Sequence, residues 1–193
     1  VDGLRRVREP GDEHVHAGAD PHTWMDPRNV AIWTDNAVAV LSALDPANAD
    51  TFAANGAAYR AELAALHDEL AVTFAAIPAE RRKLVTDHDS LGYLARAYDF
   101  TVVGSVVPSL STLASPSAQE LAALQSQIAQ EGVKAIFVDT TVNPDVAAQI
   151  AADTGATIVP LYTGSLSDTA GPAPTYIDMM RYDAAQIVAA LTR

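Results

Sequence analysis

Apolar residues recur every three or four positions between residues 27 and 77, which is the spacing of one buried face of an α-helix. Asp26-Pro27 precedes a first stripe and Asp45-Pro46 precedes a second. Asp-Pro is typical of a helix start, because the carboxylate accepts from backbone amides and proline presets the first helical φ. The pattern predicts two successive helices, the second about 45 Å long. The apolar positions are Val30, Trp33, Ala37, Val40 and Leu44 in the first helix, and Phe52, Tyr59, Leu63, Leu66, Leu70 and Phe74 in the second.

After Pro78 the pattern changes to short apolar runs that alternate with amphipathic segments. Short links between alternating strands and helices are typical of an α/β fold, in which a parallel sheet has flanking helices and right-handed crossovers. The predicted strands cover residues 83–86, 101–107, 135–138 and 157–161, and the predicted helices cover residues 91–98, 116–131, 144 onward and 175–191. We therefore predict an α/β domain that is preceded by a long helix.

Composition narrows the class of protein. The 193 residues are 49% hydrophobic and 19% charged, as in a globular protein with one good-sized core, or one domain and part of another. No apolar run approaches the roughly 20 residues that cross a bilayer. The formal net charge of -12 argues against a nucleic-acid partner, which needs a basic face. Because cysteine is absent, a metal would have to be held by histidine and carboxylate.

Residues 1–19 carry no periodic apolar pattern. A domain seldom opens on such a segment, so we expect further residues upstream of Val1. The segment contains His14 and His16, a His-x-His pair beside acidic residues that can bind a borderline cation, although an exposed pair is usually just solvated.

Two phrases place a histidine between irregular chain and a predicted helix. His88 lies in Val-Thr-Asp-His-Asp at residues 85–89, just beyond a predicted strand, where open parallel sheets bind ligands. A helix N-terminus at this point would disfavour a protonated imidazole and keep a nitrogen lone pair available. The alternative is that His88 or its aspartate neighbours merely cap that helix.

His22 lies in Asp-Pro-His-x-Trp-x-Asp-Pro at residues 20–27, a loop stiffened by two prolines. Stacking on Trp24 is the alternative role for this histidine. His67 lies one step off the apolar stripe of the long helix, so we predict that it is at the surface.

Signals for catalysis are weak. Asp87 and Asp89 form a carboxylate pair and Asp139 lies near a strand end, but no phrase matches a glycosidase, protease or nucleophile-elbow arrangement. Phosphate-binding and dinucleotide-binding glycine loops and a helical His-Glu-x-x-His are also missing. The sequence therefore offers no catalytic residue.

The two histidine phrases, in this order and with a long helix between them, resemble those of the zinc and manganese substrate-binding proteins, the metal receptors of bacterial ABC importers. In that family Asp-Pro-His-x-Trp-x-Asp-Pro carries one metal ligand, matched by His22, and Val-Thr-x-His-x-x-x-x-Tyr carries another, matched by His88. Likeness continues at residues 115–118, 132–138 and 175–180 and so covers nearly the whole chain. The resemblance implies that His22 and His88 are metal ligands.

Members of the family have two lobes, each a small parallel sheet flanked by helices, with a long helix joining them and the metal between them. The resemblance implies that residues 1–45 are the tail of the N-terminal lobe with the His22 loop, residues 46–77 the linking helix, and residues 78–193 the C-terminal lobe. It also implies a further histidine ligand upstream of Val1, so this chain alone should bind metal more weakly than an intact receptor.

The family's remaining ligand is usually an aspartate in a Thr-Asp-Ser-like phrase, and Gly164 stands at that position here. Asp168, Asp139 or a water molecule are the candidates to replace it. Histidine at position 88 and the loss of that aspartate favour zinc over manganese, because manganese prefers more oxygen ligands.

The function that the resemblance implies is transport without catalysis. A receptor in the periplasm or on the extracellular face of the cell membrane would deliver zinc, as transported ligand, to the transmembrane permease subunit of an ABC importer. A lipid anchor upstream of Val1 would attach it to the membrane. Two alternatives stay open: a metal-assisted hydrolase with an open coordination position, and an adhesin-like surface protein whose metal site has decayed, which the glycine at position 164 favours.

Overall fold

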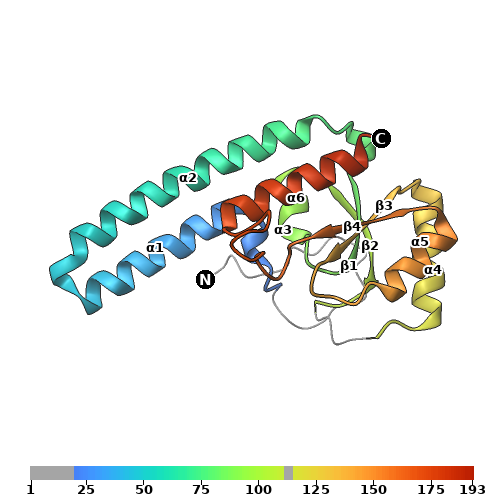
Figure 1. The fold of residues 1–193 in the computed structure, drawn as a ribbon, viewed down its shortest axis with the longest axis horizontal. Coiled ribbons are helices and arrows are strands. Elements are labelled where there is room, and N and C mark those ends of the chain that lie inside the picture. Colours follow the sequence, from blue (N-terminus) through green and yellow to red (C-terminus); the bar gives the residue numbers. More distant parts are fainter. Residues whose placement is uncertain (1–19, 111–114) are drawn as a thin grey trace.

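Residues 20–110 and 115–193 are described by the structure, a computed structural model. Two long helices lead into a small sheet that shorter helices surround (Figure 1). Short 3-10 turns precede α1, α2 and β1 at Thr23–Met25, Pro46–Asn48 and Ala79–Arg81. The helices are α1 (Pro27–Leu44), α2 (Ala49–Ala75), α3 (Gly92–Ala97), α4 (Ala118–Glu131), α5 (Asp145–Thr154) and α6 (Tyr176–Leu191), and the strands are β1 (Lys83–His88), β2 (Thr101–Val107), β3 (Ala135–Asp139) and β4 (Thr157–Leu161).

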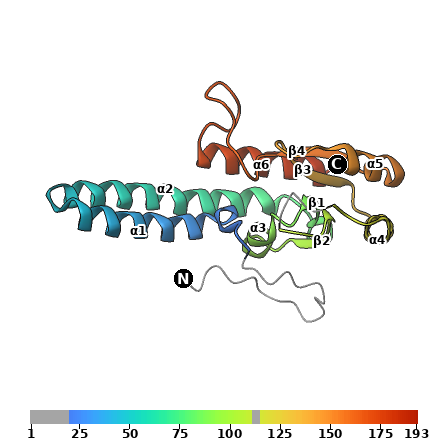
Figure 2. The ribbon, with the colours of Figure 1, turned by 90° about the horizontal axis from the view of Figure 1, so that it is seen from below.

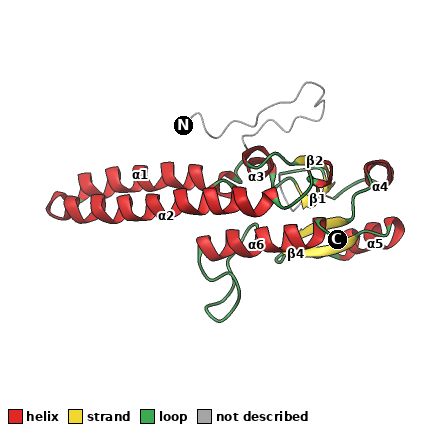
Figure 3. Cartoon of the chain, turned by 90° about the horizontal axis from the view of Figure 1, so that it is seen from above, coloured by secondary structure: helices red, strands yellow, loops and turns green. Residues whose placement is uncertain are grey.

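The four strands form one parallel sheet in the order β2-β1-β3-β4. Figure 3 draws the strands in yellow and the helices in red. This arrangement, with its flanking helices, confirms the α/β class that the alternation of apolar runs predicted. Because the strands are parallel, their carboxyl ends meet at one edge of the sheet. The two central strands end there at His88 and Asp139.

Side chains alternate along each strand and so supply two separate cores. Leu84 and Phe137 pack in one core with side chains of α2, α3 and α6. Val85 and Ile136 pack in the other with side chains of α4 and α5. His88 lies an even number of residues from Leu84, which places it on the face that α2, α3 and α6 cover. Met25 is buried in that same core and brings the turn before α1 against it.

The helices α1 and α2 lie side by side as an antiparallel pair that extends away from the sheet (Figure 1, Figure 2). Side chains of α1 lie close to the backbone of α2 at Gly56, where a Cβ atom would lie 2.4 Å from Cγ2 of Val38. A residue without a side chain is therefore needed at this crossing. Arg60 of α2 also forms an ion pair with Asp35 of α1.

The helix predicted after Asp26-Pro27 is present as α1, but its apolar stripe is not a continuous buried face. Val30 is buried, but most of the stripe faces solvent in the described chain, and Leu44 is 77% exposed. The helix instead approaches α2 through Thr34 and Val38, whose short side chains let it come close to Gly56. The stripe on α2 is buried as predicted at Leu63, Leu66, Leu70 and Phe74.

Two predicted boundaries also need correction. The strand β1 continues through His88 and α3 begins only at Gly92, so the helix N-terminus expected at His88 is not there. The helix α4, predicted from residue 116, begins only at Ala118 after the cap Ser117, whose hydroxyl accepts from the amide of Glu120 while the carboxylate of Glu120 accepts from the amide of Ser117.

Candidate metal-binding site

His22 and His88 come together at the carboxyl-terminal edge of the sheet. Their ring centres are 5.2 Å apart and their ring planes lie at 64°. His88 is the last residue of β1, and His22 is the residue before the 3-10 turn at Thr23–Met25. Both side chains are buried. The fold thus joins the two phrases that the sequence singled out.

A carboxylate contacts Nδ1 of each imidazole. Oδ1 of Asp20 lies 2.8 Å from Nδ1 of His22 and also accepts from the backbone amide of His22 at 3.0 Å. Oδ1 of Asp87 lies 3.1 Å from Nδ1 of His88. Within residues 20–110 and 115–193, no hydrogen bond engages either Nε2. A carboxylate at Nδ1 keeps the proton there and makes Nε2 the nitrogen that can bind a metal.

The surroundings of His88 are negatively charged. Burial disfavours the charged imidazole, but the hydrogen bond to Asp87 and the charges of Asp87, Asp139 and Asp89 outweigh it, so the pKa of His88 is raised. The same charges attract a divalent cation. A metal at Nε2 would therefore be drawn to this place and would compete with a proton.

Asp139, one of the candidates for the fourth ligand, has both of its oxygens engaged. Oδ2 accepts from the amide of Thr163 at 2.9 Å, from its hydroxyl at 2.6 Å and from the amide of Gly164 at 2.7 Å. Oδ1 accepts from the amide of Thr141 at 2.7 Å and from its hydroxyl. Burial alone would raise the pKa of Asp139, but these bonds lower it. This carboxylate therefore fastens the chain after β4 to the end of β3.

The other positions considered for a fourth ligand lie in the loop between β4 and α6. A Cβ atom at Gly164 would lie 3.5 Å from Oδ2 of Asp139, which is an ordinary contact. Asp168 is exposed and accepts from the amide of Ala170 at 3.1 Å. In the described ranges, no three His, Asp or Glu side chains are grouped so that they could hold a metal ion. A structural zinc site usually has four ligands, of which His22 and His88 could supply two.

Sequence reasoning missed the contacts that fasten the His22 loop. Nε1 of Trp24 donates to the carbonyl of Thr163 at 2.8 Å, and the hydroxyl of Tyr176 donates to the carbonyl of Trp24 at 2.7 Å. No local pattern announces contacts across such a separation in sequence. Asp20 was also missed as the partner of His22. An aspartate side chain often accepts from the backbone amide two residues later, so this contact could have been predicted.

The remaining histidines lie elsewhere. His67, predicted at the surface, is half-buried, and its Nδ1 lies 3.0 Å from the hydroxyl of Tyr98. His14 and His16 lie outside the described residues.

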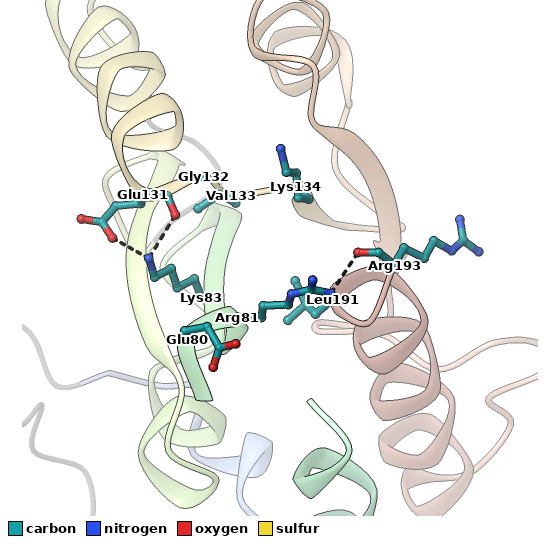
Figure 4. Close-up of a pocket in the computed structure, with 9 residues that line it drawn as sticks. All are labelled: Glu80, Arg81, Lys83, Glu131, Gly132, Val133, Lys134, Leu191 and Arg193. Atoms are coloured by element: carbon teal, nitrogen blue, oxygen red, sulfur yellow. Dashed lines mark hydrogen bonds and ion pairs between the residues drawn. The ribbon is translucent and has the colours of Figure 1, made fainter. Parts of the chain in front are cut away.

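A small pocket of about 130 Å³ lies at the opposite edge of the sheet, away from the histidines (Figure 4). Its cations contact carbonyl groups at or just after the ends of helices: Nζ of Lys83 donates to that of Glu131 at 3.0 Å, and Nη1 of Arg81 donates to those of Thr192, the cap of α6, and Arg193 at 3.4 and 3.1 Å. Cations at helix carboxyl ends stabilise a fold. The cationic side chains that line the pocket therefore have a structural role.

Comparison with known proteins gives relatives that bind metals. The iron-binding protein YfeA of Yersinia pestis is 34% identical over 163 residues, which are 84% of this chain and 52% of that protein. The high-affinity zinc uptake system protein ZnuA of Paracoccus denitrificans is 35% identical over 134 residues, 69% of this chain and 40% of that protein. The chain thus spans about half the length of these curated relatives or less.

Solved structures give the same fold. The manganese-bound periplasmic metal-binding protein of Candidatus Liberibacter asiaticus has a TM-score of 0.81 and 30% identity, over 97% of this chain and 69% of that one. By its fold and by these matches, the chain is similar to a class of α/β proteins described as periplasmic metal-binding proteins. The family model described as zinc-uptake complex component A, periplasmic, matches residues 1–190, and the chain belongs to that family.

No helix in the described ranges has the length and apolar character to span a bilayer.

Proposed function

We propose that the protein captures a divalent transition metal, zinc in preference to manganese, and passes it to the transmembrane permease subunit of an ABC importer. The observation that carries this proposal is the pair of buried imidazoles, each with a carboxylate at Nδ1, that meet at the edge of the sheet. Metal-ligating histidines are held in this way in known sites. The names of the relatives, which include iron-, zinc- and manganese-binding proteins, support a transition metal.

The separation of the rings is compatible with one ion between them. A zinc ion bonded to both Nε2 atoms at about 2.0–2.1 Å, with a tetrahedral angle, would hold the ring centres roughly 5 Å apart. The ring centres of His22 and His88 are 5.2 Å apart. Imidazole donors suit zinc and iron better than manganese, which favours carboxylate and water oxygens.

The proposal assigns a role to each part of the chain. Residues 1–45 would be the tail of an N-terminal lobe that carries His22, residues 46–77 would be the helix that links the lobes, and residues 78–193 would be the C-terminal lobe that carries His88. The receptor would work in the periplasm or on the extracellular face of the membrane. A lipid anchor upstream would attach it there.

Capture without catalysis fits the carboxylates around the pair. A hydrolase would need a base near a metal-bound water. Asp20 and Asp87 are engaged with the histidines, and Asp139 accepts hydrogen bonds on both oxygens. None of the three offers an unengaged carboxylate for that role.

Calorimetric titration of the metal-free protein with zinc and with manganese tests the proposal. We expect one zinc per chain, with weaker binding of manganese, and we expect His22→Ala and His88→Ala each to lower the affinity at least tenfold. His67→Ala is the matched control, because His67 pairs with Tyr98 on another part of the fold. Zinc should also raise the unfolding temperature in proportion to the logarithm of its free concentration.

Two results would contradict the proposal. Unchanged zinc affinity after replacement of both His22 and His88 would show that these residues do not bind the metal. A melting temperature that is independent of zinc would instead support a surface protein with a decayed site.

A further inference from the structure

Trp24 connects the His22 loop to the C-terminal part of the chain at two points. Its indole Nε1 donates to the carbonyl of Thr163 at 2.8 Å, just after β4, and its carbonyl accepts from the hydroxyl of Tyr176 at 2.7 Å, at the start of α6. The ring of Trp24 also contacts the ring of His22 edge to face, with centres 5.3 Å apart. Trp24 thus connects the loop that carries His22 to both ends of the loop between β4 and α6.

The far end of this connection is itself held in place. The amide and hydroxyl of Thr163 donate to Asp139 at 2.9 and 2.6 Å. The backbone amide of Asp139 donates to Oδ2 of Asp87 at 3.3 Å, and Oδ1 of Asp87 contacts His88. A continuous series of contacts therefore runs from His88 through these residues to Trp24 and the edge of His22.

We propose that Trp24 is a positioning residue that holds His22 at its distance from His88 before any metal arrives, with Tyr176 and Thr163 as its anchors. This rests on the proposed function, because it assigns a role to Trp24 only if the two histidines bind metal. Trp24 does not touch the metal in this scheme. It acts through His22.

The physical reason is preorganisation. Asp20 orients the ring of His22 within its loop, but the turn at Thr23–Met25 is a short 3-10 turn with poor hydrogen-bond geometry, so the place of this loop relative to His88 depends on tertiary contacts. Ordering a loop at the moment of binding subtracts from the affinity, whereas a loop that is already ordered does not. The two hydrogen bonds of Trp24 fix this turn against α6 and the chain after β4.

Tyr176→Phe and Trp24→Phe test the proposal in the whole protein, with zinc affinity measured by competition against a chelating dye. Each variant removes one donor and keeps an aromatic ring. We expect each to weaken zinc binding about three- to tenfold, which is the range that one hydrogen bond supplies. Tyr182→Phe is the control, because it removes a hydroxyl from the same helix at a ring that packs against Tyr162.

The same substitutions in a His22→Ala background separate positioning from general stability. Because the connection acts through His22, Tyr176→Phe should cause no further loss of zinc affinity once His22 is absent. An equal loss in both backgrounds would mean that Tyr176 only stabilises the fold, and it would overturn the proposal. This comparison is a double-mutant cycle between an anchor and a ligand.

The outcomes also separate this inference from the proposed function. If His22→Ala and His88→Ala weaken zinc binding while Tyr176→Phe and Trp24→Phe behave like Tyr182→Phe, the site stands and the positioning role is wrong. If neither histidine matters to zinc binding, the proposed function fails and the positioning role fails with it.

Discussion

Oδ1 of Asp20 lies 2.8 Å from Nδ1 of His22, and this contact decides which nitrogen of the imidazole can bind a metal. The same oxygen accepts from the backbone amide of His22, so the carboxylate fixes both the backbone and the ring. Asp87 stands in a similar relation to His88 at 3.1 Å. The two histidines, one before a turn and one at a strand end, thus each have a carboxylate at Nδ1.

Neutralising either carboxylate should weaken zinc binding. We expect Asp20→Asn and Asp87→Asn each to lower the zinc affinity about 10- to 100-fold, because the partner of a ligating histidine sets its tautomer and its basicity. Calorimetric titration measures the change. Asp50→Asn, at an exposed position in the first turn of α2, removes the same charge elsewhere and should leave the affinity unchanged. Equal affinities for all three variants would contradict the role of the carboxylates.

Much of the fold could be predicted because strands and helices leave different periods in the sequence. The strands at residues 101–107 and 157–161 lie where their apolar runs predicted them. The face of α1 could not be predicted, because periodicity shows that a helix has an apolar stripe but not what covers it. The face that α1 turns toward α2 is set by Gly56, since the lack of a side chain there lets α1 approach through Thr34 and Val38.

The candidate site was predictable only in part. Motif resemblance selected His22 and His88, and the fold brings them together, although their role as ligands stays a prediction. The prediction that β1 ends before His88 was wrong. The pairing of His88 with Val107 of β2 extends the strand to His88, and a polar residue at a strand end leaves no apolar pattern that would show this. Contacts such as that of Trp24 with Thr163 depend on tertiary packing, which no local pattern encodes.

A carboxylate at position 164 should strengthen metal binding. A Cβ atom there meets Oδ2 of Asp139 at 3.5 Å, which is an ordinary contact, so the backbone leaves room for a side chain to start at this position. We expect Gly164→Asp to raise the zinc affinity roughly tenfold, since an added carboxylate ligand replaces water in the coordination shell. Gly164→Asn, which has the same shape without the charge, is the control in the same titration. An Asp variant that binds zinc no better than the Asn variant would place this position outside the site.

Asp183 gives the protein a stability that depends on pH. Its side chain in α6 is completely buried, Oδ1 accepts from the amide of Tyr162 at 2.9 Å, and Oδ2 has no partner in the described chain. Burial raises the pKa of Asp183 to about 8, and the charge of Asp139 adds to the effect. The folded state therefore keeps a proton at neutral pH that the unfolded state releases near pH 4.

The sign of the expected change follows from this difference in bound protons. Between about pH 4 and pH 8 the folded state binds more protons, so stability falls as the pH rises. Asp183→Asn removes this loss and should raise the free energy of unfolding at pH 7 by roughly 2–4 kcal/mol, with a smaller gain near pH 4. Urea unfolding of the metal-free protein over this range measures both. A gain that stays constant with pH would show that Asp183 does not titrate in this way.

The crossing of α1 and α2 should not tolerate a side chain at position 56. A Cβ atom there would lie 2.4 Å from Cγ2 of Val38, so we expect Gly56→Ala to lower the free energy of unfolding by about 1–3 kcal/mol despite the higher helix propensity of alanine. Val38→Ala removes the clashing methyl group, so the double variant should be nearly as stable to unfolding as the Val38→Ala variant alone. Urea unfolding of the two single variants and the double variant gives the coupling energy between the positions. If the two losses were simply additive, the close approach of the helices at Gly56 would not be the reason for glycine at this position.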